Sequence, residues 1–248
     1  MKRLVELASR QDLKAFEDNW MEALAGDVRD VPGLLEAISA LEAQGQFAKA
    51  SSYLQLLLPL ILKAEGREDD AVLVLKRMAK ISPREKTLRK HFIDVFRRKF
   101  GGHDGFDKLV RHSQIESDIE MLKAAERLES YLAFSPGSYV EHPAGWGVGV
   151  VKAIDSDDAS VIIDFEEAKN HELELEMACR ITRHLDADHF KAMRFDRRDQ
   201  LLDMAEKDRV GLVKCVVLGR DRTTTVRDLR DRLTDGIIST KDWSRWWT

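Results

Sequence analysis

The sequence is poor in cysteine and aromatic residues and has no long hydrophobic run. Only two of its 248 residues are cysteines, Cys179 and Cys215, and their spacing suits neither a metal site nor a disulfide framework, so we expect free thiols in a reducing compartment. The longest apolar run, residues 54–62, is broken by Gln55 and Pro59 and is far too short to cross a membrane. The charged first residues include no apolar segment of signal-peptide length. We therefore expect a cytoplasmic protein without membrane contact.

Neither positive nor negative charge is in large excess. Charged residues make up 34% of the chain, the formal net charge is -4 and the pI is about 6.0. A mildly acidic chain is a poor general ligand of nucleic acid, because that binding depends on neutralising phosphates with Lys and Arg. The basic residues between 191 and 232 alternate with aspartates, which predicts ion pairs on helix surfaces. A local contact with nucleic acid stays open as an alternative.

Catalytic motifs are absent as well. The sequence holds no Gly-x-Ser-x-Gly element and no Gly-Lys-Ser/Thr loop, and neither cysteine has a neighbouring histidine. His184 and His189 are separated by Asp186 and Asp188, yet a metal site needs three or four converging ligands, so we interpret this segment as a solvated turn. We expect no enzymatic activity, no metal, no cofactor and no small-molecule substrate.

Amphipathic helices are predicted for residues 1–134. Leu13, Phe16, Trp20 and Leu24 recur at helical spacing, and similar patterns follow one another between Gly and Pro breaks. Pro59 is expected to kink or end its helix. The series predicts a helix-hairpin array that is loosely similar to tetratricopeptide repeats, with an irregular period.

The hydrophobic period changes from helical to alternating at residues 135–137, which we take as a domain boundary. Strands are predicted at 139–142, 147–155, 161–165 and 171–175, and the alternation of Glu172, Glu174 and Glu176 predicts one acidic, solvent-facing stripe. Helical patterns return over residues 185–248, with Asp186 or Asp188 as the expected N-cap of the first helix. Three tryptophans fall within the last six residues, and we expect that the sequence is truncated there.

A glycine-rich stretch, residues 137–154, is the most informative part of the chain. It holds four glycines within thirteen residues, but β-branched valines lie among them and no helix pattern follows, as a phosphate-binding loop would require. The glycines instead predict a bending strand with close backbone approaches in a small curled sheet.

Two resemblances add to this interpretation. The succession of Gly137, His142-Pro143, Gly147, Gly149 and the strand at 161–165 resembles the Tudor-like barrels of bacterial transcription proteins, namely the polymerase-interacting domain of the CarD family and the C-terminal barrel of UvrD-type helicases. The helical first part, this module and the tryptophan-rich ending together resemble the N-terminal region of long GreA-type transcription elongation factors.

The predicted fold is therefore α+β, with a helical array (1–134), a Tudor-like antiparallel β-barrel (135–184) and C-terminal helices (185–248). The resemblance implies a non-catalytic accessory region that binds RNA polymerase, at a β-subunit lobe, through an edge strand of the barrel. The candidate contact residues are Val140, His142, Trp146, Val148, Val150, Val151 and Lys152. Trp146 is either an exposed anchor or a core residue. The alternatives are a nucleic-acid-binding module built from the barrel and the basic helices, and a protein-interaction scaffold unrelated to transcription.

Overall fold

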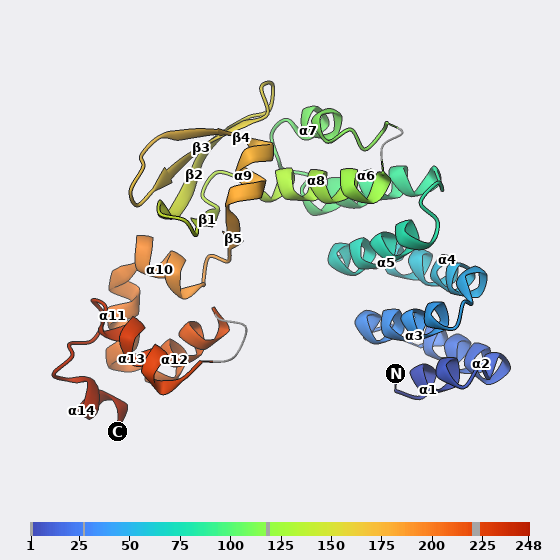
Figure 1. The fold of residues 1–248 in the computed structure, drawn as a ribbon, viewed down its shortest axis with the longest axis horizontal. Coiled ribbons are helices and arrows are strands. Elements are labelled where there is room, and N and C mark those ends of the chain that lie inside the picture. Colours follow the sequence, from blue (N-terminus) through green and yellow to red (C-terminus); the bar gives the residue numbers. More distant parts are fainter. Residues whose placement is uncertain (1, 27, 118–119, 220–223) are drawn as a thin grey trace. The chain divides into compact units, whose positions relative to one another are not determined.

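The computed structural model describes residues 2–26, 28–117, 120–219 and 224–248. The chain forms two compact units, Met1–Leu132 and Ala133–Thr248 (Figure 1). The α+β class is confirmed: a helical first part is followed by a small antiparallel sheet and further helices. None of the described helices combines the length and hydropathy needed to cross a membrane.

In the first unit most of the packing joins helices that are one or two positions apart along the chain, as expected for a helix-hairpin array (Figure 1). These helices are α1 (Lys2–Ser9), α2 (Leu13–Ala25), α3 (Val31–Ala43), α4 (Phe47–Lys63), α5 (Glu68–Ile81), α6 (Thr87–Lys99), α7 (Phe106–Ser113) and α8 (Met121–Ala133).

Local sequence signals set the ends of several of these helices. Asp12 and Asp30 cap α2 and α3 by accepting hydrogen bonds from the backbone N–H groups of Ala15 and Gly33. Pro59 does not end its helix: α4 continues through it to Lys63, because the packed apolar face outweighs one missing backbone hydrogen bond.

The second unit begins with the sheet. Its strands are β1 (Tyr139–His142), β2 (Gly147–Asp155), β3 (Ser160–Phe165), β4 (His171–Glu174) and β5 (Arg183–Leu185). They pair antiparallel in the order β4-β3-β2-β1-β5, and the register of β2 against β3 shifts between Val151 and Ala153, as in a β-bulge. A bulge increases local twist and bends its strand, which agrees with the predicted curled sheet.

The expected closed barrel is wrong. Among the described residues the outer strands β4 and β5 each pair on one side only, so the sheet stays open between them. These strands are four and three residues long, and helix α9 (Leu175–Ile181) takes up most of the chain between them. So little backbone remains for pairing that closure would add few hydrogen bonds. The helix also breaks the expected acidic stripe, because Glu176 lies in α9 rather than on β4.

Five helices complete the second unit. They are α10 (Phe190–Asp196), α11 (Arg198–Lys207), α12 (Arg209–Leu218), α13 (Val226–Thr234) and α14 (Trp243–Trp247). Their apolar faces share one core that includes Phe190, Leu201, Leu212, Leu233 and Trp243. Burying these side chains removes apolar surface from water, which is the main favourable contribution to the free energy of folding.

Two expectations for these helices change. The N-cap of α10 is His189, whose Nδ1 accepts a hydrogen bond from the Lys191 backbone, and not an aspartate. The terminal tryptophans fold back onto the unit: Trp243 is buried, and Trp246 donates its indole N–H to the carbonyl of Ala205 at 2.7 Å. Only Trp247 is exposed, at 41%.

Candidate partner-binding site

The sequence-predicted contact residues lie on β1, on the turn that follows it, and on β2. Val140, Val148 and Val151 are buried, and Val150 is half-buried. Val148 and Val150 belong to the apolar contact between the sheet and α10. His142 and Trp146 are half-buried, and Lys152 is exposed. That these residues contact a partner stays a prediction, and the structure limits direct contact to those with accessible side chains.

The edge strand of the module differs from the expected one. β1 has a paired neighbour on both sides, and β2 pairs with β3 along most of its length and with β1 over residues 147–150. The edges are β4 and β5. These two strands therefore offer an edge for strand addition by a partner, whereas most of the backbone of β1 and β2 is already paired.

Trp146 lies in a cluster of rings at the end of the sheet where the β1–β2 and β3–β4 turns meet. Its ring centroid is 4.2 Å from that of His142, nearly parallel to it, 4.3 Å from His171 and 5.4 Å from Phe165. We call these four residues the Trp146 cluster. Phe165 is buried while the other three are half-buried. Trp146 therefore packs on the core and keeps part of its surface accessible, a placement between the exposed anchor and the core residue that the sequence left open.

Backbone geometry fixes this cluster. The Trp146 backbone N–H donates to His142 Nδ1 across 3.4 Å. On the other side, the backbone N–H of Val148 donates to Glu166 Oε2 at 3.1 Å, and the Glu166 N–H donates to the Val148 carbonyl at 2.9 Å. The β1–β2 turn is thus held both to β1 and to the end of β3.

The glycines act as the sequence predicts. Gly147 has a φ of +76°, and a Cβ built on it would lie 2.0 Å from Glu166 Oε2. A Cβ on Gly149 would lie 2.7 Å from the side chains of Ile163 and Phe165. The glycines therefore supply a turn and a close approach of β2 to β3.

A buried carboxylate joins the sheet to the helices that follow it. Glu141 on β1 accepts a hydrogen bond from Arg183 of β5, with 2.5 Å between Oε2 and Nη2, and its Oε1 pairs with the ammonium of Lys191 on α10. Burial acts to raise the pKa of Glu141, but the hydrogen bonds and charges of Lys191 and Arg183 outweigh it, so the pKa lies below the usual value.

Comparison with known proteins gives this geometry a family context. The chain is 26% identical to "Transcription elongation factor GreA" of Chlamydia pneumoniae over 257 residues, which cover 100% of this chain and 34% of that protein. It is 27% identical to the protein of the same name from Chlamydia trachomatis serovar D, over 94% of this chain and 32% of that one.

The chain is homologous to long GreA-type proteins.

This agrees with the resemblance seen in the sequence. A "Putative GreA-associated domains protein" of Treponema pallidum is 25% identical over 71% of this chain and 26% of its own length. The GRAD helix-turn-helix domain matches residues 191–248, which hold α11 to α14. The chain spans about a third of the length of the GreA-type relatives, and no solved structure matches it. The homology supports a transcription-related accessory region.

In this GreA-related chain the surroundings of the Trp146 cluster are acidic. Glu166 and Glu167 follow Phe165 directly, and Glu172 follows His171; all three carboxylates are exposed. The charge next to the cluster therefore favours a partner surface that carries basic side chains.

The described part of the chain contains no group of three or more His, Cys, Asp or Glu side chains placed to hold a metal ion. His189 uses both ring nitrogens, since Nδ1 accepts from the Lys191 backbone and Nε2 lies 3.1 Å from the Gly219 carbonyl oxygen. His184 packs its ring against Phe134 with 4.4 Å between centroids. Both histidines therefore make contacts within the fold.

Sequence reasoning found Trp146 and His142 but not the residues that complete the site. Phe165 and His171 come from β3 and β4, and only strand pairing brings them to Trp146. The ion cluster of Glu141, Arg183 and Lys191 joins residues as far as 50 positions apart. A charged residue next to the apolar Val140 within a predicted strand was the local sign in the sequence that Glu141 needs a partner of opposite charge.

Proposed function

We propose that this chain is a non-catalytic accessory region of a bacterial transcription elongation factor, that it binds RNA polymerase through the sheet module, and that the helical array acts as a scaffold. The observation that carries the proposal is the homology to GreA-type proteins along the whole chain, together with a partly accessible tryptophan held rigidly on this module. Rigid aromatic side chains of this kind dominate the energetics of many protein interfaces.

The contact combines two elements of the module. The Trp146 cluster supplies the anchor, with Lys152 as a further exposed contact on β2. The adjacent edge strand β4 has unpaired backbone groups on its outer side and exposed glutamates at positions 172 and 174. A partner strand with basic side chains would pair with this edge while an apolar pocket of the partner receives Trp146. We assign this partner surface to a lobe of the polymerase β subunit.

Binding of the full chain to purified bacterial core RNA polymerase tests the proposal. Trp146→Ala is the test variant, and Trp247→Ala is its matched control, because Trp247 is an exposed tryptophan of the same unit outside the cluster. We expect binding by the wild type and the control and a large loss for Trp146→Ala. A wild-type chain that does not bind, or a folded Trp146→Ala variant that binds as tightly as the wild type, would contradict the proposal.

A further inference from the structure

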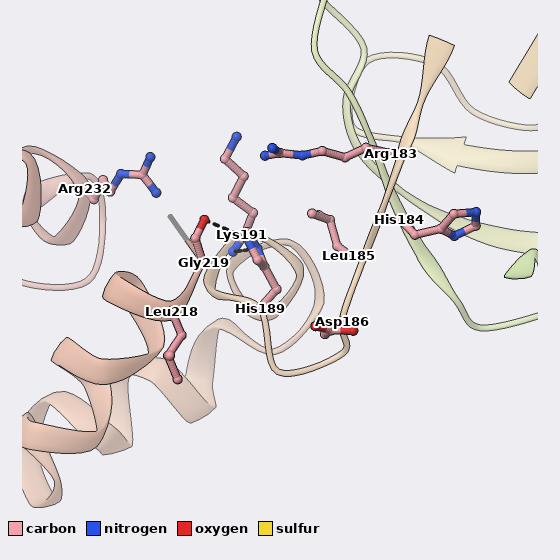
Figure 2. A pocket seen from close by; sticks show the side chains of 9 residues that line it. All are labelled: Arg183, His184, Leu185, Asp186, His189, Lys191, Leu218, Gly219 and Arg232. Atoms are coloured by element: carbon pink, nitrogen blue, oxygen red, sulfur yellow. Dashed lines mark hydrogen bonds between the residues drawn. The ribbon is translucent and has the colours of Figure 1, made fainter. Parts of the chain in front are cut away.

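A cationic pocket lies in the second unit where β5, the start of α10, the end of α12 and α13 come together. It encloses about 500 Å³. Arg183 of β5, Lys191 of α10 and Arg232 of α13 line it, and Figure 2 shows their side chains reaching into the same region from these separate elements. We propose that this pocket binds a phosphate group of a nucleic-acid backbone. The proposal does not rest on polymerase binding, since it uses other side chains than the Trp146 cluster.

Glu141 holds two of these cations in place without neutralising both. Its carboxylate pairs with Arg183 and Lys191, and its side chain is only 11% exposed, whereas those of Arg183 and Lys191 are 61% and 29% exposed. The Glu141 carboxylate therefore lies beneath the two cationic side chains, and Arg183 and Lys191 face the solvent. One carboxylate balances the charge of one of the two cations, so the pair keeps a surplus positive charge at the pocket.

Both side chains also keep hydrogen-bond donors for a ligand. Glu141 accepts from one guanidinium nitrogen of Arg183 and from the ammonium of Lys191. A guanidinium has five N–H donors and an ammonium three. Arginine matches two phosphate oxygens with its planar fork, and lysine adds a point charge, which is a common pairing in phosphate recognition.

Two other polar groups that line the pocket, the Gly219 carbonyl and Asp186, bear on whether an anion can bind beside Arg183 and Lys191. The carbonyl oxygen of Gly219 lies within hydrogen-bond distance of His189 Nε2, at 3.1 Å (Figure 2). Because His189 Nδ1 accepts from the Lys191 backbone, its proton is on Nε2, which donates to that carbonyl. Among the described residues that line the pocket, Asp186 is the one carboxylate, and it lies at the opposite end of the pocket from the Arg183 guanidinium (Figure 2).

A nucleic-acid backbone suits this pocket because further cations continue on the same helix. α13 also carries Arg227 and Arg230, both exposed, close in sequence to Arg232. Arg227 and Arg230 lie on other faces of α13 than Arg232, so a chain of several phosphates contacts them only by passing around the helix, whereas a free phosphate ion uses the pocket alone. Phosphate contacts of this type position a nucleic acid without reading its sequence.

The test measures binding of the full chain to a fluorescently labelled DNA duplex at several salt concentrations. Arg183→Gln removes one phosphate contact. We expect about fivefold weaker binding at low salt. We also expect the slope of log K against log salt concentration to lose about 0.9 in magnitude. Arg245→Gln is the matched control, since its side chain is 84% exposed on α14 outside the pocket, and we expect no change for it.

A second variant controls for loss of folding. Arg183→Gln leaves buried Glu141 with one partner fewer, so the double variant Arg183→Gln, Glu141→Gln removes both charges together. Circular dichroism checks that each variant is folded. The expected slope change is the same for both variants.

A second arm distinguishes the source of the phosphate. Inorganic phosphate is titrated against the wild type by NMR, and then against the complex with the duplex. Displacement of the duplex by phosphate supports one shared site, and phosphate binding without duplex binding assigns the pocket to the free ion. The proposal is overturned if neither probe binds at low salt, if the folded variants keep the wild-type slope, or if an acidic peptide binds the pocket while phosphate and duplex do not.

Discussion

Glu141 on β1 and Lys191 at the start of α10 form an ion pair although 50 residues separate them in the sequence. This pair, with Arg183 from β5, ties the sheet to the helices that carry the GRAD helix-turn-helix match. The sheet and these helices also share an apolar contact formed by Tyr139, Val148, Leu185 and Ala192. Because the sheet module and the C-terminal helices pack within one compact unit, a perturbation of the ion pair should be felt in both.

Removing the Glu141 charge should reduce stability and its dependence on pH. The pKa of Glu141 is lower in the folded chain than its ordinary value of 4.5, so the ion pair stabilises the fold above that pH and the stabilisation is lost as the pH falls through and below it. We expect Glu141→Gln to cost about 1–2 kcal/mol at neutral pH, a figure that allows for the solvent exposure of Arg183.

Urea unfolding at neutral and at acidic pH measures this effect. Glu167→Gln is the control, because Glu167 is exposed and should leave the midpoint unchanged. Equal acid sensitivity of the wild type and the Glu141→Gln variant would show that another carboxylate governs it.

Gly149→Ala should destabilise the sheet. The added methyl group would lie 2.7 Å from the side chains of Ile163 and Phe165, so β2 and β3 have to move apart. We expect a loss of about 1–3 kcal/mol in the free energy of unfolding. Gly102→Ala meets no atom within 4 Å and is the control. A thermal midpoint for Gly149→Ala equal to that of the control would argue against this close approach.

Trp146→Ala should weaken polymerase binding by at least about 2 kcal/mol, or about 30-fold, if Trp146 is the anchor of the proposed interface. Its loss also removes the rings' mutual packing, so near-ultraviolet circular dichroism should change while the far-ultraviolet helix signal is kept. Surface plasmon resonance on immobilised polymerase gives the affinity. A similar loss for Lys152→Ala alone would shift the centre of the contact from the ring cluster to β2.

The Cys179 thiol should be almost inert. Burial is the main cause that raises its pKa to about 12, so very little thiolate forms near neutral pH. The pKa of Cys215 is also raised, mainly by burial and then by Asp188. We expect slow alkylation of both by iodoacetamide and fast alkylation after unfolding in urea, followed by mass spectrometry of the peptides. Rapid labelling of Cys179 in the folded chain would mean that α9 opens readily.

Thr225→Ala should loosen the start of α13. Thr225 and Asp228 form a reciprocal capping box, in which the Thr225 hydroxyl accepts from the Asp228 backbone and the Asp228 carboxylate accepts from the Thr225 backbone. We expect a loss of about 1 kcal/mol in the free energy of unfolding. Thr225→Ser keeps the hydroxyl and should restore most of it. Without that restoration, the loss would have to come from packing of the threonine methyl group.

The amino-acid sequence by itself determined the elements of this protein. The strands at 139–142 and 147–155 were predicted with the bounds that the structure has, because alternating apolar patterns, turns and glycines act over a few neighbouring residues. The glycines of β2 were also predicted correctly as bends and close approaches. The resemblance to GreA-type proteins came from this same local pattern.

Tertiary structure alone decided how these elements meet. Which strands lie at the edge depends on pairing between distant segments. The edges are therefore β4 and β5 rather than the strands that carry the candidate contact residues, and the sheet stayed open where a barrel was expected. The partners of Trp146 and Glu141 come from strands and a helix far along the chain. Such contacts depend on the balance of burial, pairing and charge across the whole unit, and no local pattern carries that information.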